Sequence, residues 1–111
     1  MSTKRRVVIT GLGMVGPVGL TVKESWANIL AGNSGIGPIT HFDVSTFSVR
    51  FGGSVWNFDP AQYIPAKDVK KMDPFIHYGV AAAKEAIADS GLEVTEENGE
   101  RIGVAIGSGI G

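Results

Sequence analysis

The stretch Arg6-Val-Val-Ile-Thr-Gly-Leu-Gly-Met-Val-Gly-Pro-Val-Gly19 decides most of what this chain can be. Its β-branched run predicts a central strand over residues 4–10, because both faces of that strand would be apolar. The run then stops at glycines. Gly11, Gly13 and Gly16 have the G-x-G-x-x-G spacing of a dinucleotide-binding turn, so a nucleotide site is the first hypothesis to test.

The residues that follow do not complete such a site. A dinucleotide turn needs its helix to begin within the glycine motif, and an acidic residue about 20 positions further on. The first helix start signals here are Thr21 and Glu24, which form a capping box, and residues 30–36 hold no acidic side chain. A dinucleotide-binding domain therefore stays open only as a third alternative.

The hydrophobic periodicity predicts an α/β fold, in which apolar strands are separated by helices and form a mixed or parallel sheet. The last strand has an apolar face and a Gly/Ala face, which predicts close packing on the small side. Ala81 to Ala83, with Gly79, make the longest helix slim, so another backbone could approach it closely. The predicted elements are strands over 4–10, near 49–55 and over 101–108, and helices over 22–31, 66–72 and 74–90.

Composition limits the function classes. The chain has 111 residues, of which 43% are hydrophobic, enough for the core of one small domain. A net charge of −1 gives no support for a nucleic-acid partner, and the absence of cysteine excludes a thiol nucleophile or zinc-thiolate site within these residues. No apolar run approaches the roughly 20 residues of a membrane span, and the short apolar run before Gly11 does not predict a signal peptide. We expect a cytoplasmic protein without a membrane segment.

No catalytic, cofactor or metal constellation assembles from the residues. His41 and His77 lack metal-ligand spacing, and His77, inside a largely apolar helix, is expected to be a hydrogen-bonded or rim histidine rather than a base. Asp43 and Asp59 occur in turn contexts, where local capping explains them. The acidic connection over 93–100, together with Asp89 just before it, is expected to be solvated. Six aromatic residues between 42 and 63 predict a packed irregular excursion, because Arg50 is the one basic residue among them.

Three lysines form the most specific surface pattern. Lys67, Lys70 and Lys71 are spaced i, i+3 and i+4, so a helix would project them from one face. Such a face is either simply solvated or a small electropositive platform for an acidic partner. Spacing alone favours the solvated face.

The opening stretch resembles that of the β-ketoacyl-acyl-carrier-protein synthases of the thiolase-like fold, most of all their bacterial type II elongating members. The family more usually carries Ser or Thr where this chain has Gly16, so one difference creates the dinucleotide-like spacing. The likeness continues, in order, through Trp26 to Ile36, Thr40-His-Phe-Asp43, Lys71-Met-Asp-Pro-Phe75, Asp89-Ser-Gly-Leu92 and Arg101-Ile-Gly-Val-Ala-Ile-Gly-Ser-Gly-Ile-Gly111.

This resemblance implies a layered α/β/α fold with a mixed sheet, of which residues 1–111 would be the truncated N-terminal part of the ketosynthase N-terminal half. The family's reaction is a decarboxylative Claisen condensation of an acyl-enzyme with malonyl-acyl-carrier protein, without a cofactor. Its nucleophilic cysteine and two catalytic histidines would lie beyond Gly111. His41 and His77 do not match them, so residues 1–111 alone are expected to be inactive.

The resemblance also implies roles for particular side chains. Lys67, Lys70 and Lys71 match the family's basic surface for the acidic acyl-carrier protein, and Ile110 matches a position that lines the acyl pocket near the dimer interface. The full-length family is homodimeric, and we expect residues 1–111 by themselves to self-associate. A non-catalytic module that docks an acidic carrier protein is the second alternative.

Overall fold

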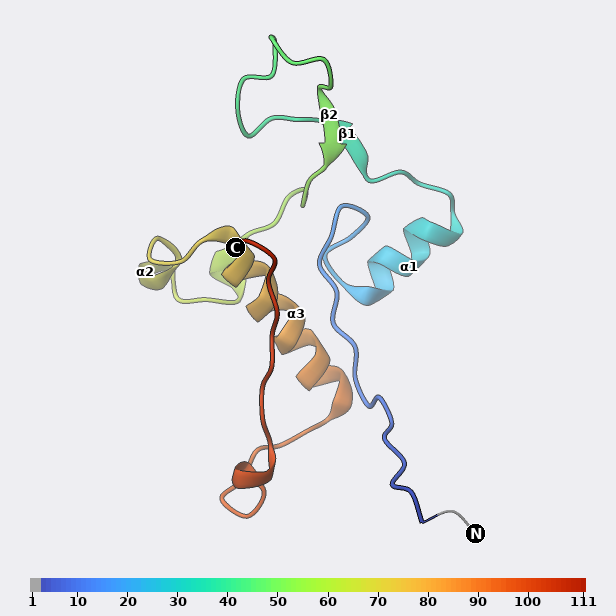
Figure 1. The fold of residues 1–111 in the computed structure, drawn as a ribbon, viewed down its shortest axis with the longest axis vertical. Coiled ribbons are helices and arrows are strands. Elements are labelled where there is room, and N and C mark those ends of the chain that lie inside the picture. The colour runs from blue at the N-terminus through green and yellow to red at the C-terminus, as the bar shows by residue number, and fades with distance from the viewer. Residues whose placement is uncertain (1–2) are drawn as a thin grey trace.

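Helix α3, Pro74–Ser90, is the longest element of the described chain (Figure 1). The computed structural model describes residues 3–111. In chain order its other elements are helix α1, Val22–Leu30, strands β1, Ile36–Pro38, and β2, Phe51–Gly53, the 3-10 turn η1, Pro60–Gln62, helix α2, Ala66–Val69, and the 3-10 turn η2, Gly99–Arg101.

The two longer helices begin and end close to the predicted residues. The Thr21 hydroxyl accepts a hydrogen bond from the Glu24 amide at 3.1 Å, which fixes the start of α1. Gly32 after α1 and Gly91 after α3 have φ values of 74° and 71°, the left-handed region in which glycine carries no steric penalty. These local features account for helix ends close to the predicted residues.

The start of α3 lacks a side-chain cap, and α2 ends earlier than predicted. Asp73 precedes α3, but its side chain makes no capping bond, and its backbone carbonyl instead accepts from the Ile76 amide at 3.0 Å. Helix α2 ends at Val69 rather than residue 72, because the following turns close through i→i+3 bonds, Lys71 to Asp68 among them. The lysines thus lie partly on the helix and partly on the turn after it.

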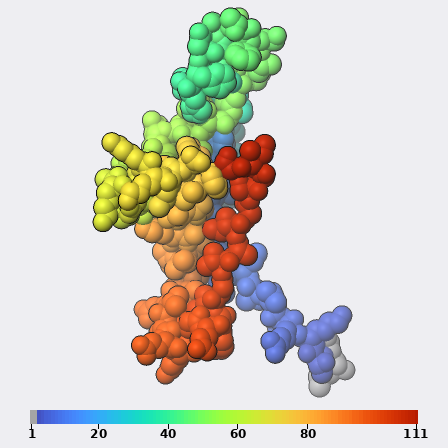
Figure 2. All heavy atoms as spheres, turned by 60° about the vertical axis from the view of Figure 1, so that its left-hand side comes forward, coloured from blue at the N-terminus to red at the C-terminus, as the bar shows by residue number. Residues whose placement is uncertain are grey.

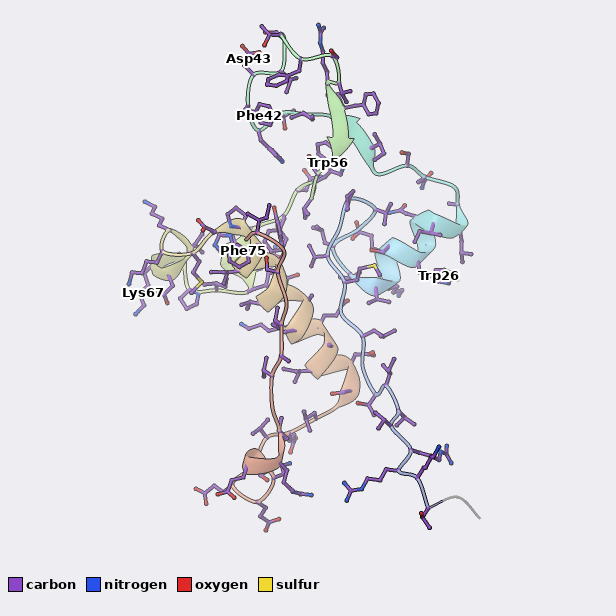
Figure 3. The ribbon with its side chains drawn as sticks, viewed as in Figure 1. Trp26, Phe42, Asp43, Trp56, Lys67 and Phe75 are labelled. Carbon is purple, nitrogen blue, oxygen red and sulfur yellow. The ribbon has the colours of Figure 1, made fainter. Side chains whose placement is uncertain are left out.

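The sheet is a single antiparallel pair. Ile36 pairs with Gly53 and Pro38 with Phe51, so the strand expected near residues 49–55 is present as β2. The Trp56 indole donates to the Gly35 carbonyl at 2.8 Å and fastens the base of this hairpin, as Figure 3 shows. The loop beyond the strands extends away from the helices (Figure 1).

The predicted strands over 4–10 and 101–108 are not formed as strands. Both segments are extended and run opposite to α3, the last one beside the helix and residues 4–10 beyond its C-terminal end (Figure 1). From residue 5 to 10 and from 103 to 110, no backbone hydrogen bond joins either segment to another part of the described chain. A strand exists only as a member of a ladder, so these segments have strand sequences without strand partners.

The close approach to α3 is confirmed. A β-carbon built on Gly11 would lie 2.2 Å from the Ala86 carbonyl oxygen, and one on Gly13 would lie 1.8 Å from that of Ala82. The close packing expected for the small face of residues 101–108 is not present, since a β-carbon on Gly103 or Gly107 would meet no described atom within 4 Å.

A single large core, as composition suggested, does not form among residues 3–111. Among these residues the buried apolar side chains are Ile64 and Ala81, whereas Trp26 and Leu30 on the apolar face of α1 are 59% and 69% exposed. The radius of gyration is 17.7 Å, against about 13 Å for a compact chain of this length. Figure 2 shows the resulting elongated outline, with the hairpin standing apart. Much apolar surface is thus left without a covering layer.

Candidate functional site

The three predicted lysines lie together on one exposed projection of the chain, formed by α2 and the turn after it. Lys67 lies in the helix, Lys70 caps its C-terminus, and Lys71 follows directly. All three are exposed, and Figure 3 shows Lys67 pointing away from α3. We call this group of three exposed lysines, on α2 and directly after it, the lysine platform.

The charge of the lysine platform is only partly neutralised. Lys71 Nζ lies 3.5 Å from an Asp68 carboxylate oxygen, an i, i+3 pair in which the lysine side chain is 73% exposed. Exposed pairs of this kind contribute about 0–1 kcal/mol and are screened by salt. Lys67 and Lys70 make no ion pair within residues 3–111. Two ammonium groups thus remain available to an acidic partner.

Two buried residues, Ile64 and His77, lie next to the lysine platform or contact it. Ile64, 5% exposed, precedes α2, and His77 of α3 contacts the last residue of α2 through a 3.0 Å hydrogen bond between its Nε2 and the Val69 carbonyl. The prediction that His77 is a hydrogen-bonded structural histidine is confirmed. The Lys84 ammonium also donates to the Tyr63 carbonyl.

Ile110 is placed differently. Its side chain is fully exposed in the described chain, so residues 3–111 do not enclose it in an acyl pocket. Gly111 beside it approaches the Phe75 ring, since a β-carbon on that glycine would lie 3.2 Å from two ring carbons. The end of the chain is therefore positioned against the start of α3, as Figure 1 also shows. The assignment of Ile110 to an acyl pocket stays a prediction.

The opening glycines do not form a nucleotide site. The amides of Leu12 and Met14 donate to carboxylates of α3, to Asp89 at 3.0 Å and Glu85 at 2.9 Å. Glu85 also accepts from the Val22 amide, the first of α1, at 3.1 Å. A pyrophosphate needs such amides free, and two carboxylates beside them would repel its charge. The arrangement excludes the dinucleotide alternative.

Glu85 and Asp89 bind backbone amides of the opening stretch, a role that the sequence patterns did not indicate. Asp89 is exposed, as expected for the acidic connection, but its carboxylate also accepts a hydrogen bond from the Leu12 amide. The two acids are spaced i, i+4 and so project from one face of α3. That spacing, beside the small residues Ala82 and Ala86, was the signal that could have revealed a backbone partner.

The other polar candidates have local roles. Asp43 accepts from the Ser45 amide at 3.0 Å, and Asp59 accepts from the Ala61 amide at 3.0 Å, as predicted from their turn contexts. His41 is exposed. In the part of the chain that the structure describes, no three potential metal ligands gather, and no helix is long and apolar enough to cross a membrane.

Comparison with known proteins identifies the family. Residues 4–111 match the N-terminal domain of the beta-ketoacyl synthases. The chain belongs to the β-ketoacyl synthase family. This ketosynthase segment is 62% identical over 109 residues to 3-oxoacyl-[acyl-carrier-protein] synthase 2 of Vibrio cholerae, covering 98% of this chain and 26% of the relative. It is 45% identical over 111 residues to the protein of the same name from Staphylococcus aureus strain COL, covering 100% and 27%.

A solved structure extends the likeness to the fold of the ketosynthase segment. The ishigamide ketosynthase/chain length factor superposes with a TM-score of 0.73 at 38% identity, covering 86% of this chain and 23% of that one. The resemblance inferred from the motifs is thereby confirmed, and the described elements are those of part of a ketosynthase N-terminal domain. The chain spans about a quarter of the length of the curated relatives it matches.

Proposed function

We propose that this ketosynthase segment belongs to a β-ketoacyl-acyl-carrier-protein synthase of the type II elongating class. The enzyme would extend fatty acyl chains by decarboxylative Claisen condensation of an acyl-enzyme with malonyl-acyl-carrier protein, in the cytoplasm and as a homodimer. The observation that supports this most strongly is the family match over residues 4–111, together with 62% identity to a 3-oxoacyl-[acyl-carrier-protein] synthase 2.

In this proposal residues 1–111 are the truncated N-terminal part of the ketosynthase N-terminal half. They would contribute to a layered α/β/α fold in which segments 4–10 and 101–108 gain strand partners from the rest of the protein. Residues 5–10 and 103–110 have no backbone hydrogen bond to another part of the described chain, and the apolar face of α1 is exposed, which supports this arrangement. The cysteine nucleophile would lie outside these residues, which contain no cysteine.

The lysine platform is the proposed carrier-protein surface. Lys67, Lys70 and Lys71 would meet acidic side chains of the acyl-carrier protein, and the exposure of all three supports this role. Ile110 would line the acyl pocket of the complete enzyme and limit the length of the bound chain. Both assignments rest on matching positions in the family.

Titration of the full-length protein with acyl-carrier protein tests the platform. Changing all three lysines to glutamate should weaken binding about tenfold or more at low salt, and wild-type affinity should fall as salt rises. Lys23→Glu, an exposed charge reversal on α1, is the matched control and should bind nearly as wild type. Equal affinities for the triple variant and the wild type would reject the platform.

A non-catalytic carrier-docking module is the second candidate, because the same platform would serve it. The two candidates differ in turnover. Full-length protein that binds carrier protein but forms no 3-oxoacyl product would favour the module, whereas stoichiometric release of carbon dioxide and product favours the synthase.

A further inference from the structure

Helix α2 is too short to hold its own direction. Its four residues, Ala66–Val69, form a single turn, whereas isolated helices shorter than about 12 residues are marginal in water. Its cap, Pro65, contributes no side-chain hydrogen bond. The direction in which Lys67 and its neighbours point therefore has to be fixed by contacts outside the helix.

The buried imidazole of His77 supplies such a contact. His77 is 7% exposed, and its Nε2 lies 3.0 Å from the carbonyl oxygen of Val69, the last residue of α2. A carbonyl oxygen only accepts, so the proton belongs on Nε2 and the imidazole is the donor. The same oxygen accepts from the Met72 amide at 3.3 Å, which closes the turn containing Lys70 and Lys71. One donor thus holds the junction between the helix and the turn.

A second group of contacts holds the segment before α2. The Tyr63 ring stacks on Phe58 with centroids 5.6 Å apart, and Phe58 packs edge-on against Tyr78 of α3 at 5.1 Å. The Lys84 ammonium, also from α3, donates to the Tyr63 carbonyl. The segment is therefore attached to α3 both before and after α2. Of these attachments, the His77 bond is the one that reaches α2 itself.

We propose that His77 is a positioning residue of the lysine platform. It acts through the Val69 carbonyl, without contacting the partner, and it holds the ammonium groups in the arrangement that an acidic carrier protein meets. This inference rests on the proposed function of the platform. A surface that is already ordered loses less conformational entropy when it binds, so the anchor should increase affinity for the carrier.

The test uses the full-length protein with three substitutions at one position. His77→Phe keeps an aromatic ring but removes the donor, and His77→Asn keeps a polar amide that is too short to reach the carbonyl. His77→Gln restores an amide N–H at about the distance of Nε2. The readouts are affinity for acyl-carrier protein and turnover of an acyl-pantetheine thioester, which carries no protein to dock.

We expect His77→Phe and His77→Asn to weaken carrier binding about fivefold, the scale of one lost hydrogen bond. His77→Gln should bind within about twofold of wild type, and acyl-pantetheine turnover should be unchanged in every variant. If His77→Phe does not fold, His77→Asn serves as the folded variant without the donor.

Two results would overturn the positioning role. One is wild-type carrier affinity in a folded variant without the donor. The other is an equal loss in His77→Gln, or a parallel loss of acyl-pantetheine turnover, because either would indicate general damage. The triple lysine reversal separates the two proposals. If it weakens binding and His77→Phe does not, the platform stands and the anchor fails, whereas unchanged binding in the reversal rejects the platform itself.

Discussion

The backbone of Gly13 lies so close to Ala82 that a β-carbon at position 13 would be 1.8 Å from the Ala82 carbonyl oxygen. Gly11 stands in nearly the same relation to Ala86, at 2.2 Å. Gly16, which completes the dinucleotide-like spacing, would meet no described atom within 4 Å. The opening glycines are therefore a packing surface for α3, and the third glycine of the apparent motif takes no part in it.

Gly13→Ala should destabilise the full-length protein by about 1–3 kcal/mol, because the new methyl group displaces a helix backbone that cannot move as a flexible side chain would. Gly16→Ala is the matched control and should lie within about 0.5 kcal/mol of wild type. Urea unfolding of both variants measures the difference. Equal midpoints for the two would contradict the packing role of Gly13.

Glu85→Gln should loosen the junction of the opening turn, α1 and α3. The carboxylate accepts from the Met14 and Val22 amides and places a negative charge at the N-terminus of α1, where the helix dipole favours it. We expect a loss of about 1–2 kcal/mol in unfolding free energy. Glu96→Gln removes the same charge from an exposed turn and is the control.

Hydrogen exchange at the Met14 amide provides the local readout for that substitution. Exchange should accelerate in Glu85→Gln and stay unchanged in Glu96→Gln. Unaltered protection of Met14 in Glu85→Gln would show that the carboxylate is not the group holding this amide.

The local signals in the sequence predicted the helices well and the strands poorly, for a physical reason. Thr21, Gly32 and Gly91 determine helix ends through bonds and dihedral angles within a few residues, so their sequence context is sufficient. A strand depends on a partner that no local signal specifies. Residues 4–10 and 101–108 have strand sequences, yet the described chain gives them no ladder.

The candidate site, like the fold, has a part that local sequence patterns predict and a part that they do not. Helical spacing alone predicted that Lys67, Lys70 and Lys71 would project from one helix face, and the structure leaves all three exposed but places Lys70 and Lys71 after the end of α2. The contacts made by His77 and Glu85 join residues that are distant in the chain or on different elements, so periodicity could not identify their partners. Ile110 shows the limit most plainly, since the described residues leave its side chain fully exposed.

The Asp43 carboxyl should titrate below its ordinary pKa of 3.8, chiefly because it accepts a hydrogen bond from the Ser45 amide and also one from the Ser45 side chain. Because the pKa is lower in the folded state than in the unfolded state, this carboxylate stabilises the fold at a pH above its unfolded-state pKa. That contribution is lost as the pH falls through the folded-state pKa. NMR titration measures it directly. Ser45→Ala should move the pKa part of the way back, and a wild-type value above 3.8 would contradict the turn geometry.

Residues 1–111 expressed alone should self-associate. The exposed surface is 9155 Å², against about 5,800 Å² for a compact protein of this mass, and the α1 face carrying Trp26 and Leu30 is uncovered. Trp26→Glu combined with Leu30→Glu should reduce association, whereas Lys23→Glu on the same helix should not. Sedimentation velocity measures this. A single monomeric species at moderate concentration would contradict it.

The condensation assay tests the central claim most directly. Full-length protein and residues 1–111 are supplied in parallel with acyl- and malonyl-acyl-carrier protein, and 3-oxoacyl product and carbon dioxide are measured. We predict that the full-length protein forms both in equal amounts and that residues 1–111, which lack any cysteine, form neither. Absence of product from the folded full-length protein, or turnover by residues 1–111 alone, would contradict the assignment.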